Sequence, residues 1–274
     1  MIRVIPAWSE EGFTARAPSV WGSGDSLSIA RSFAAGARAF IARLALQPGE
    51  SVLDVGCGTG NLAIPAARAG ARVCGIDSAP NLIAQARLAA RTAGCIIAFE
   101  VGDAEALPYH DGHFDTTVTM FGAIFAHPPD RAATELLRVT RPGGRVAMAN
   151  WTPDGFIGQM LRAHTSLVPL PSGVPSPLEW GNEDVVRGRF RGGFTSLICT
   201  RRTLQLQFPF PPAAVTELFA TSYGPTVATL RATDSDGATQ LRDELTRLLQ
   251  HYNLARNGTT TVVGEYLDVQ ARVV

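Results

Sequence analysis

Apolar strands alternate with helical segments between residues 51 and 151, and this alternation limits the possible folds more than any other feature of the sequence. Strands are predicted at 51–55, 71–76, 96–101, 114–121 and 145–151, and helices at 61–69, 80–93 and 130–140. Strands that are apolar throughout are buried on both faces, as in a parallel sheet that helices cover on each side. The pattern therefore predicts an α/β fold with a doubly wound, Rossmann-like sheet of five parallel strands.

The segments outside this core have a different pattern. Residues 1–47 are helical in pattern after a loose start, and residues 152–193 are rich in Pro and Gly. Alternation of apolar and polar residues predicts two further strands, at about 199–208 and 260–272, which we expect to form a terminal antiparallel pair of the same sheet. Helices are predicted over 212–223 and 236–254.

A chain of 274 residues is long enough to bury a core without disulfides or metal ions. We predict a single domain, in which helices outside the sheet form a cap. Its parts are an N-terminal helical cap (1–47), a ligand-binding core (48–151), lid helices (152–198 and 211–258) and the terminal strands (199–210 and 259–274).

The charge composition excludes several functions. The chain has 24 basic and 24 acidic residues, so its formal net charge is zero, and every basic residue is an arginine. Without a lysine there is no Schiff-base lysine, no pyridoxal-phosphate enzyme and no phosphate loop of the Walker type. A net charge of zero without a basic run also argues against a nucleic-acid partner.

The four cysteines form neither a C-x-x-C pair nor a disulfide framework, which is typical of reduced thiols in the cytoplasm. The first residues contain no apolar run of signal-peptide length, and a run of about 18 apolar residues occurs nowhere in the chain. We therefore expect a cytoplasmic protein without a membrane span. The sequence contains no signal for an oligomeric state.

The segment VLDVGCGTG (52–60) is the strongest functional signal. Its three glycines, Gly56, Gly58 and Gly60, follow a buried strand and precede a helix. Glycine at these positions lets the backbone turn sharply and approach a ligand closely. The N–H groups at the start of the helix face the same place, so the segment predicts a ligand site at the carboxyl end of the first strand.

Three carboxylates near the ends of the strands indicate the kind of ligand. Asp54 lies two residues before the first glycine, Asp77 ends the second strand, and Asp103 follows the third. Asp77 can accept hydrogen bonds from both hydroxyls of a ribose. Asp54 would repel a pyrophosphate but suits a ligand with a cationic amine. Without a ligand, the three residues would be ordinary cap, loop or turn acids.

This combination resembles the seven-stranded, class I AdoMet-dependent methyltransferases, and among them the subfamily of ubiquinone and menaquinone biosynthesis. Five motifs occur in the family's order: VLDVGCGTG, GID (75–77), GDAEALP (102–108), FDTTVTMFG (114–122) and RPGGRV (141–146). The resemblance covers about residues 48–151. WGSGD (21–25) is also similar to a segment that precedes the first motif in some relatives.

The resemblance implies that the cofactor is S-adenosyl-L-methionine (AdoMet). Asp54 would lie near its ammonium group, and Asp77, with Ser78 beside it, would bind the ribose hydroxyls. The remaining residues implied to bind AdoMet are Gly56, Cys57, Gly58 and Gly60 at the methionine part, Leu82, Asp103 and Ala104 at the adenine, and the backbone carbonyl of Phe121 near the amine.

The resemblance also implies the reaction, transfer of a methyl group from AdoMet to a small, fairly apolar acceptor. His127, in the segment HPPD (127–130), is the candidate general base, and it is equally typical of a loop before a helix. Four aromatic residues outside the sheet, of which we expect at least two to face the sulfonium, are candidates for the acceptor pocket: Trp21, Phe156, Trp180 and Tyr223. Their alternative role is to pack the cap helices on the sheet.

Two other classes of function stay open at this point. One is a protein that binds AdoMet without methyl transfer, as a scaffold or sensor. The other is a nicotinamide oxidoreductase, which Asn61 disfavours because the third glycine of G-x-G-x-x-G should stand there. A metal site is not expected, since His110 and His113 have no further ligands in a suitable arrangement.

Overall fold

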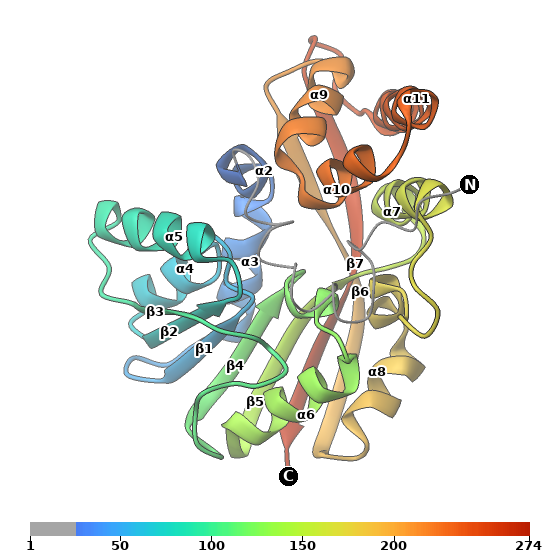
Figure 1. The fold of residues 1–274 in the computed structure, drawn as a ribbon. Coiled ribbons are helices and arrows are strands. Elements are labelled where there is room, and N and C mark those ends of the chain that lie inside the picture. Colours follow the sequence, from blue (N-terminus) through green and yellow to red (C-terminus); the bar gives the residue numbers. More distant parts are fainter. Residues whose placement is uncertain (1–25) are drawn as a thin grey trace. The chain divides into compact units, whose positions relative to one another are not determined.

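The computed structural model describes residues 26–274 (Figure 1). Its strands are β1 (Ser51–Val55), β2 (Arg72–Asp77), β3 (Ala98–Val101), β4 (Phe114–Met120), β5 (Thr140–Trp151), β6 (Phe194–Phe208) and β7 (Thr260–Val273). Its α-helices are α2 (Ser26–Ser32), α3 (Ala34–Leu44), α4 (Ala63–Arg68), α5 (Pro80–Thr92), α6 (Pro129–Val139), α7 (Gly155–Leu167), α8 (Glu183–Phe190), α9 (Pro212–Ser222), α10 (Gly224–Ala232) and α11 (Ser235–Tyr252). Short 3-10 helices follow β4 (η2, Ala123–Phe125) and precede α8 (η3, Pro177–Gly181).

The seven strands form one sheet in the order β3-β2-β1-β4-β5-β7-β6. The strands β1 to β5 pair in parallel, and β7 runs antiparallel to β5 with β6 beyond it at the edge. The predicted α/β fold, with five parallel strands and a terminal antiparallel pair, is therefore confirmed.

The strand order reverses between β1 and β4, and this reversal positions the site. Crossovers between parallel strands are right-handed, so the helices before and after the reversal lie on opposite faces of the sheet. α4 and α5 cover one face, and α6 and α8 cover the other (Figure 1). In sheets of this kind the loops diverge at the switch point, and ligands bind outside the carboxyl ends of the strands there.

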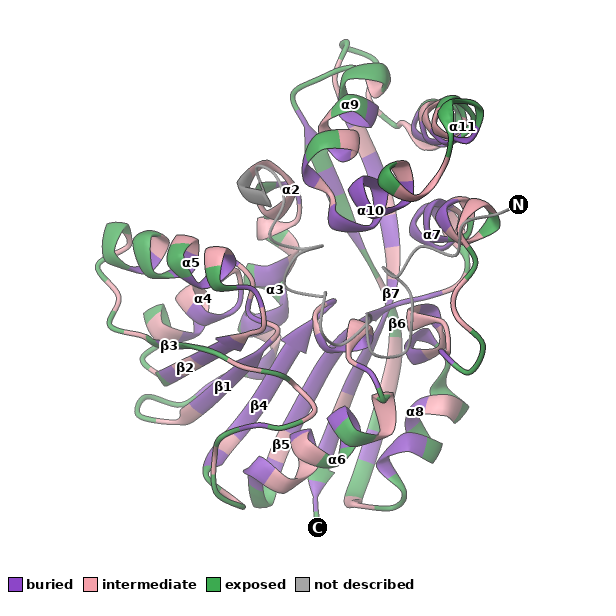
Figure 2. Ribbon diagram, in the orientation of Figure 1, coloured by how far each residue is buried: buried purple, intermediate pink, exposed green. Residues whose placement is uncertain are grey.

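The central strands are buried on both faces (Figure 2). β1 and β4 have almost no exposed residue, whereas the edge strand β6 alternates between buried and exposed positions. The exposed flank of α11 is polar, as expected for a helix that packs on one side only, whereas the exposed flank of α5 includes Leu88.

Two compact units account for the described residues. The core unit consists of residues 34–152, 177–202 and 266–274 and holds β1 to β5 with the adjoining parts of β6 and β7. The helical unit consists of residues 26–33, 153–176 and 203–265 and holds α2, α7, α9, α10 and α11 with the remaining parts of the two long strands. The division into cap, core and lid given above stays a prediction.

No helix among the described residues is both long and apolar enough to cross a lipid bilayer.

Candidate active site

The loop between β1 and α4 is shaped by backbone hydrogen bonds and by three glycines. The N–H groups of Gly56 and Cys57 both donate to the carbonyl of Ile76, at 2.8 and 3.0 Å. Gly56, Gly58 and Gly60 have φ angles of +66°, +52° and +90°, a region in which residues with a Cβ atom are strained. The three predicted glycines therefore form one turn between the ends of β1 and β2.

Gly56 and Gly58 need to be glycine for different reasons. A Cβ atom on Gly56 would lie 2.8 Å from the Cα atom of Gly122, so the loop touches the segment after β4 backbone to backbone. A Cβ atom on Gly58 would meet no atom of the described residues within 4 Å, so the backbone at Gly58 is open with respect to this part of the chain.

Asp54 is a buried carboxylate that has no cationic partner among the described residues. Its side chain is 1% exposed and accepts one hydrogen bond among the described residues, from the N–H of Ala63 at 3.0 Å. Burial raises the pKa of Asp54 to about 8; the hydrogen bond from Ala63 opposes this shift, and the nearby charge of Asp77 adds to it. A carboxylate in such a place is stabilised in its ionised form only when a cation arrives.

Asp77 connects the loop after β1 to the loop after β2. One of its carboxylate oxygens accepts the N–H of Gly58 at 2.8 Å, and the other accepts the N–H of Ala79 at 2.9 Å. Burial raises the pKa of Asp77, and these two hydrogen bonds oppose the shift. Ser78 lies beside it, half-buried at the start of the loop to α5.

The other predicted cofactor residues surround the ends of β1 to β4. Leu82 is buried on the first turn of α5, and Cys57 is buried in the glycine loop. Burial raises the pKa of the Cys57 thiol well above its usual range, so it is not an activated nucleophile. Asp103 is exposed after β3, and Ala104 next to it is half-buried.

Phe121 follows β4 in a strained conformation. Its φ angle is +61°, which is rare for a bulky side chain. Its ring stacks on Trp151, the last residue of β5, with 3.5 Å between ring centroids and 6° between planes. Strain of this kind is concentrated at functional sites and persists where the surroundings hold it.

Comparisons with known proteins identify the family. A family model described as a methyltransferase domain matches residues 52–144. The chain is 35% identical over 237 residues to an uncharacterized protein of Mycobacterium tuberculosis (strain H37Rv), which covers 85% of this chain and 86% of that protein. The structure of the YcgJ protein from Bacillus subtilis is similar with a TM-score of 0.57 at 19% identity, covering 87% of this chain and 98% of that one. The chain belongs to the class I AdoMet-dependent methyltransferases.

A further relative agrees with the predicted subfamily over part of the chain. A demethylmenaquinone methyltransferase of Beutenbergia cavernae is 36% identical over 145 residues, which make up 51% of this chain and 58% of that protein. The family predicted from the five motifs is thus confirmed.

In this methyltransferase the candidate base His127 lies just after η2 and is 9% exposed. Its backbone N–H donates to a carboxylate oxygen of Glu105 at 2.6 Å. Burial raises the pKa of Glu105, and the N–H of His127 lowers it. Glu105 therefore ties the loop after β3 to the loop after β4. Sequence reasoning missed this residue, although it stands within the third motif.

Trp180 is the one candidate acceptor-pocket residue that the structure describes in the core unit. It is 1% exposed, and the Arg189 guanidinium lies over its ring, 4.6 Å from the centroid. The next residue, Gly181, lies directly against the carbonyl of Trp151, so η3 packs at the carboxyl end of β5. The indole N–H of Trp180 is buried without a partner among the described residues.

Phe156 and Tyr223 belong to the helical unit. Phe156 on α7 is buried, with its ring centroid 5.9 Å from that of Tyr252. Tyr223, between α9 and α10, lies edge-on to the buried His164. Trp21 lies outside the described residues. The substrate-binding role of these aromatic residues stays a prediction.

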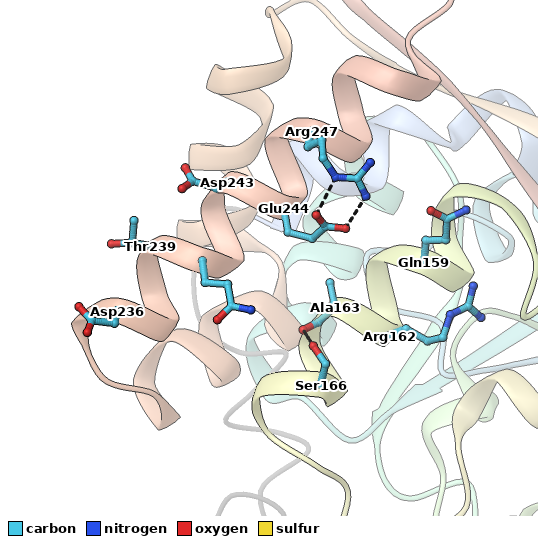
Figure 3. Close-up of a pocket in the computed structure, with 10 residues that line it drawn as sticks. Gln159, Arg162, Ala163, Ser166, Asp236, Thr239, Asp243, Glu244 and Arg247 are labelled. Atoms are coloured by element: carbon cyan, nitrogen blue, oxygen red, sulfur yellow. Dashed lines mark hydrogen bonds and ion pairs between the residues drawn. The ribbon is translucent and has the colours of Figure 1, made fainter.

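A polar groove of about 850 Å³ lies between α7 and α11 of the helical unit (Figure 3). Its lining includes Arg162 from α7 and Asp243 from α11, and Arg247 pairs with Glu244 at 2.6 Å along α11. None of the predicted site residues lines this groove. Methyl transfer needs an environment from which water is excluded, so we do not assign the groove to the acceptor.

Proposed function

We propose that this methyltransferase binds AdoMet at the carboxyl ends of β1 and β2 and transfers its methyl group to a small, fairly apolar acceptor. The observation that carries the proposal is Asp54, a carboxylate that is 1% exposed and, within the described part of the chain, accepts a single backbone hydrogen bond. The ammonium group of AdoMet would supply the missing positive charge, directly or through a water molecule.

The rest of the site supports the same ligand. The backbone at Gly58 is open with respect to the described residues, which leaves room for the methionine part beside Asp54. An ionised carboxylate has about four lone-pair sites. Asp77 uses two of them on the N–H groups of Gly58 and Ala79, and the others would accept the ribose hydroxyls.

Bound AdoMet supplies a methyl group that is already activated by its sulfonium charge. The chain's own residues would then have to align the acceptor in line with the methyl group and exclude water. For a hydroxyl or amine acceptor, the imidazole of His127 would take the proton. For a carbon acceptor whose proton is already lost, no base is needed.

We infer the chemical class of the acceptor from the net charge of the chain and from the aromatic character of the candidate acceptor residues. The chain has a formal net charge of zero and no basic run, and its candidate acceptor residues are aromatic. Aromatic walls exclude water and attract the sulfonium cation by about 0.5–2 kcal/mol. A small phenol or quinone fits these walls better than a nucleic acid.

The proposal is tested by binding and by transfer. AdoMet or S-adenosylhomocysteine at about 100 times its Kd should raise the Tm by about 5–10 °C. Incubation with methyl-labelled AdoMet and a panel of small phenols and quinones should then label one acceptor class. A Tm that rises with NADH but with neither AdoMet nor S-adenosylhomocysteine refutes the proposal.

A further inference from the structure

The strained backbone at Phe121 is held by contacts with residues that lie outside the five motifs. Phe121 has a φ angle of +61°, stacks on Trp151, and meets the edge of the Tyr266 ring with 5.9 Å between centroids. Trp151 and Tyr266 are directly paired between β5 and β7, so the two rings lie on the same face of the sheet. The Phe121 ring thus packs against aromatic rings from two other strands, β5 and β7.

An ionic network fixes the outer ring of this group. The Tyr266 hydroxyl accepts a hydrogen bond from Arg43 of α3 at 2.8 Å. Arg43 also donates to Asp268 at 3.0 Å, and Arg202 of β6 donates to the same carboxylate oxygen at 2.9 Å. Asp268 is 2% exposed, and these two arginines compensate its buried charge. All these residues belong to the core unit.

We propose that Trp151, Tyr266 and Arg43 are positioning residues that hold Phe121 in its left-handed conformation, so that its backbone carbonyl faces the amino group of the cofactor. This inference rests on the proposed AdoMet site. A phenylalanine released from the stack relaxes to an extended or right-handed conformation, and its carbonyl then turns away. The network therefore sets the affinity for the amino-acid end of the ligand and leaves the adenosine end unchanged.

The experiment compares ligands that differ at that end. AdoMet and S-adenosylhomocysteine carry the amino group, whereas 5′-methylthioadenosine has the nucleoside and the sulfur but no amino-acid part. In Trp151→Leu, loss of one hydrogen bond to a charged group should weaken the first two by about tenfold and leave methylthioadenosine within about twofold. Calorimetric titration of each ligand measures the three affinities.

Two further variants separate positioning from general damage. Phe121→Gly adopts the left-handed conformation without strain, so adding Trp151→Leu to it should cause no further loss of AdoMet affinity. Phe114→Leu is the matched control, a buried aromatic residue at the other end of β4, and should change none of the three affinities. If Trp151→Leu does not fold, Tyr266→Phe removes only the hydroxyl and should show the same selectivity, with a loss of about threefold.

The outcomes are distinct. An equal loss for all three ligands, or unchanged affinity for all three in the folded variants, overturns the positioning role while the AdoMet site stands. An additive loss in the double variant overturns it as well. If the wild-type protein binds neither AdoMet nor S-adenosylhomocysteine, the proposed function fails, and the inference fails with it.

Discussion

The proton on Asp54 links stability to cofactor binding at the scale of one residue. Burial raises its pKa from 3.8 to about 8, so the folded chain holds the proton more tightly than the unfolded chain. A raised pKa stabilises the fold at pH values below the unfolded pKa, and this contribution is lost as the pH rises toward the folded pKa. Each pH unit in the window from 3.8 to about 8 lowers the free energy of unfolding by at most about 1.4 kcal/mol.

Asp54→Asn should remove this pH dependence. The amide does not titrate, so the Tm of the variant relative to the wild type should rise between about pH 5 and pH 8, by about 2–4 °C for each kcal/mol. Thermal unfolding across this range measures it. Asp103→Asn, at an exposed position, is the control and should run parallel to the wild type. Parallel curves for Asp54→Asn would mean that the carboxylate is already ionised without a ligand.

The same residue predicts how AdoMet affinity depends on pH. A cationic ammonium prefers the ionised carboxylate, so wild-type affinity should increase as the pH rises toward about 8, by at most about tenfold per pH unit. Asp54→Asn should bind weakly and without this dependence. Titration calorimetry in buffers of different ionisation enthalpy also counts the proton released. A variant that keeps the wild-type slope assigns the proton to another group.

Asp77→Ala should weaken AdoMet by about 100-fold or more. Two hydrogen bonds from the ribose hydroxyls to a carboxylate are lost, each worth about 1.5–3 kcal/mol. The structure adds a second reason, because Asp77 also accepts the N–H of Gly58 and so fixes the loop that lines the site. Circular dichroism should show an intact fold. Wild-type affinity in the folded variant would remove Asp77 from the site.

At the scale of elements, contact between two loops distinguishes the glycines. Gly56, Gly58 and Gly94 have similar φ angles of +66°, +52° and +68°, so alanine at each shares a strain cost of about 1–2 kcal/mol. Only Gly56→Ala also collides with backbone, at Gly122.

Gly56→Ala should therefore destabilise the chain by about 1–3 kcal/mol more than Gly94→Ala does. Gly58→Ala should cost no more stability than Gly94→Ala, because its Cβ atom would meet no atom of the described residues within 4 Å, yet it should weaken AdoMet where Gly94→Ala does not. Chemical denaturation and ligand titration of the three variants measure both effects. Equal stability losses at Gly56 and Gly94 would mean that the loops separate at little cost.

The elements of the core were predictable because their signals are local. Apolar runs bounded by Gly and Pro gave β1 at its observed bounds and the other parallel strands within a few residues. The differences have physical reasons. β5 begins at Thr140, before the predicted start at residue 145, because the segment around Pro142 joins the strand through a register shift. β6 begins at Phe194, five residues before the predicted start at residue 199, because its pairing with β7 at the edge of the sheet continues that far. α10 was missed, since Gly224-Pro225 resembles a turn although proline also suits a first helical turn.

The candidate site was predictable only where a motif is continuous in sequence. The glycine loop, Asp54 and Asp77 follow the strands that carry them. The contact of Trp151 with Phe121, and the bond between Arg43 and Tyr266, join residues that are 30 and 223 positions apart. No periodicity encodes such pairs, because they depend on the strand order. Glu105 was missed for the same reason, since its partner His127 lies beyond β4.

At the scale of the whole molecule, two strands run through both compact units. The boundary at 202–203 falls inside β6, and the boundary at 265–266 falls inside β7. A strand cannot lose half of its length to unfolding without fraying the pairing of the other half. We therefore predict one cooperative thermal transition for the chain. Such a transition is common for a single domain, whereas two independent domains unfold in separate transitions.

Saturating AdoMet should move this transition as a whole. Binding at about 100 times the Kd adds about 2.7 kcal/mol, which corresponds to a shift of about 5–10 °C. The residues proposed to bind AdoMet all lie in the core unit. The measurement therefore shows whether the helical unit unfolds at the same raised temperature as the core unit. Differential scanning calorimetry should show a single peak with and without ligand, and equal calorimetric and van't Hoff enthalpies in both cases. Two peaks, of which AdoMet moves only one, would mean that the units unfold independently in spite of the strands they share.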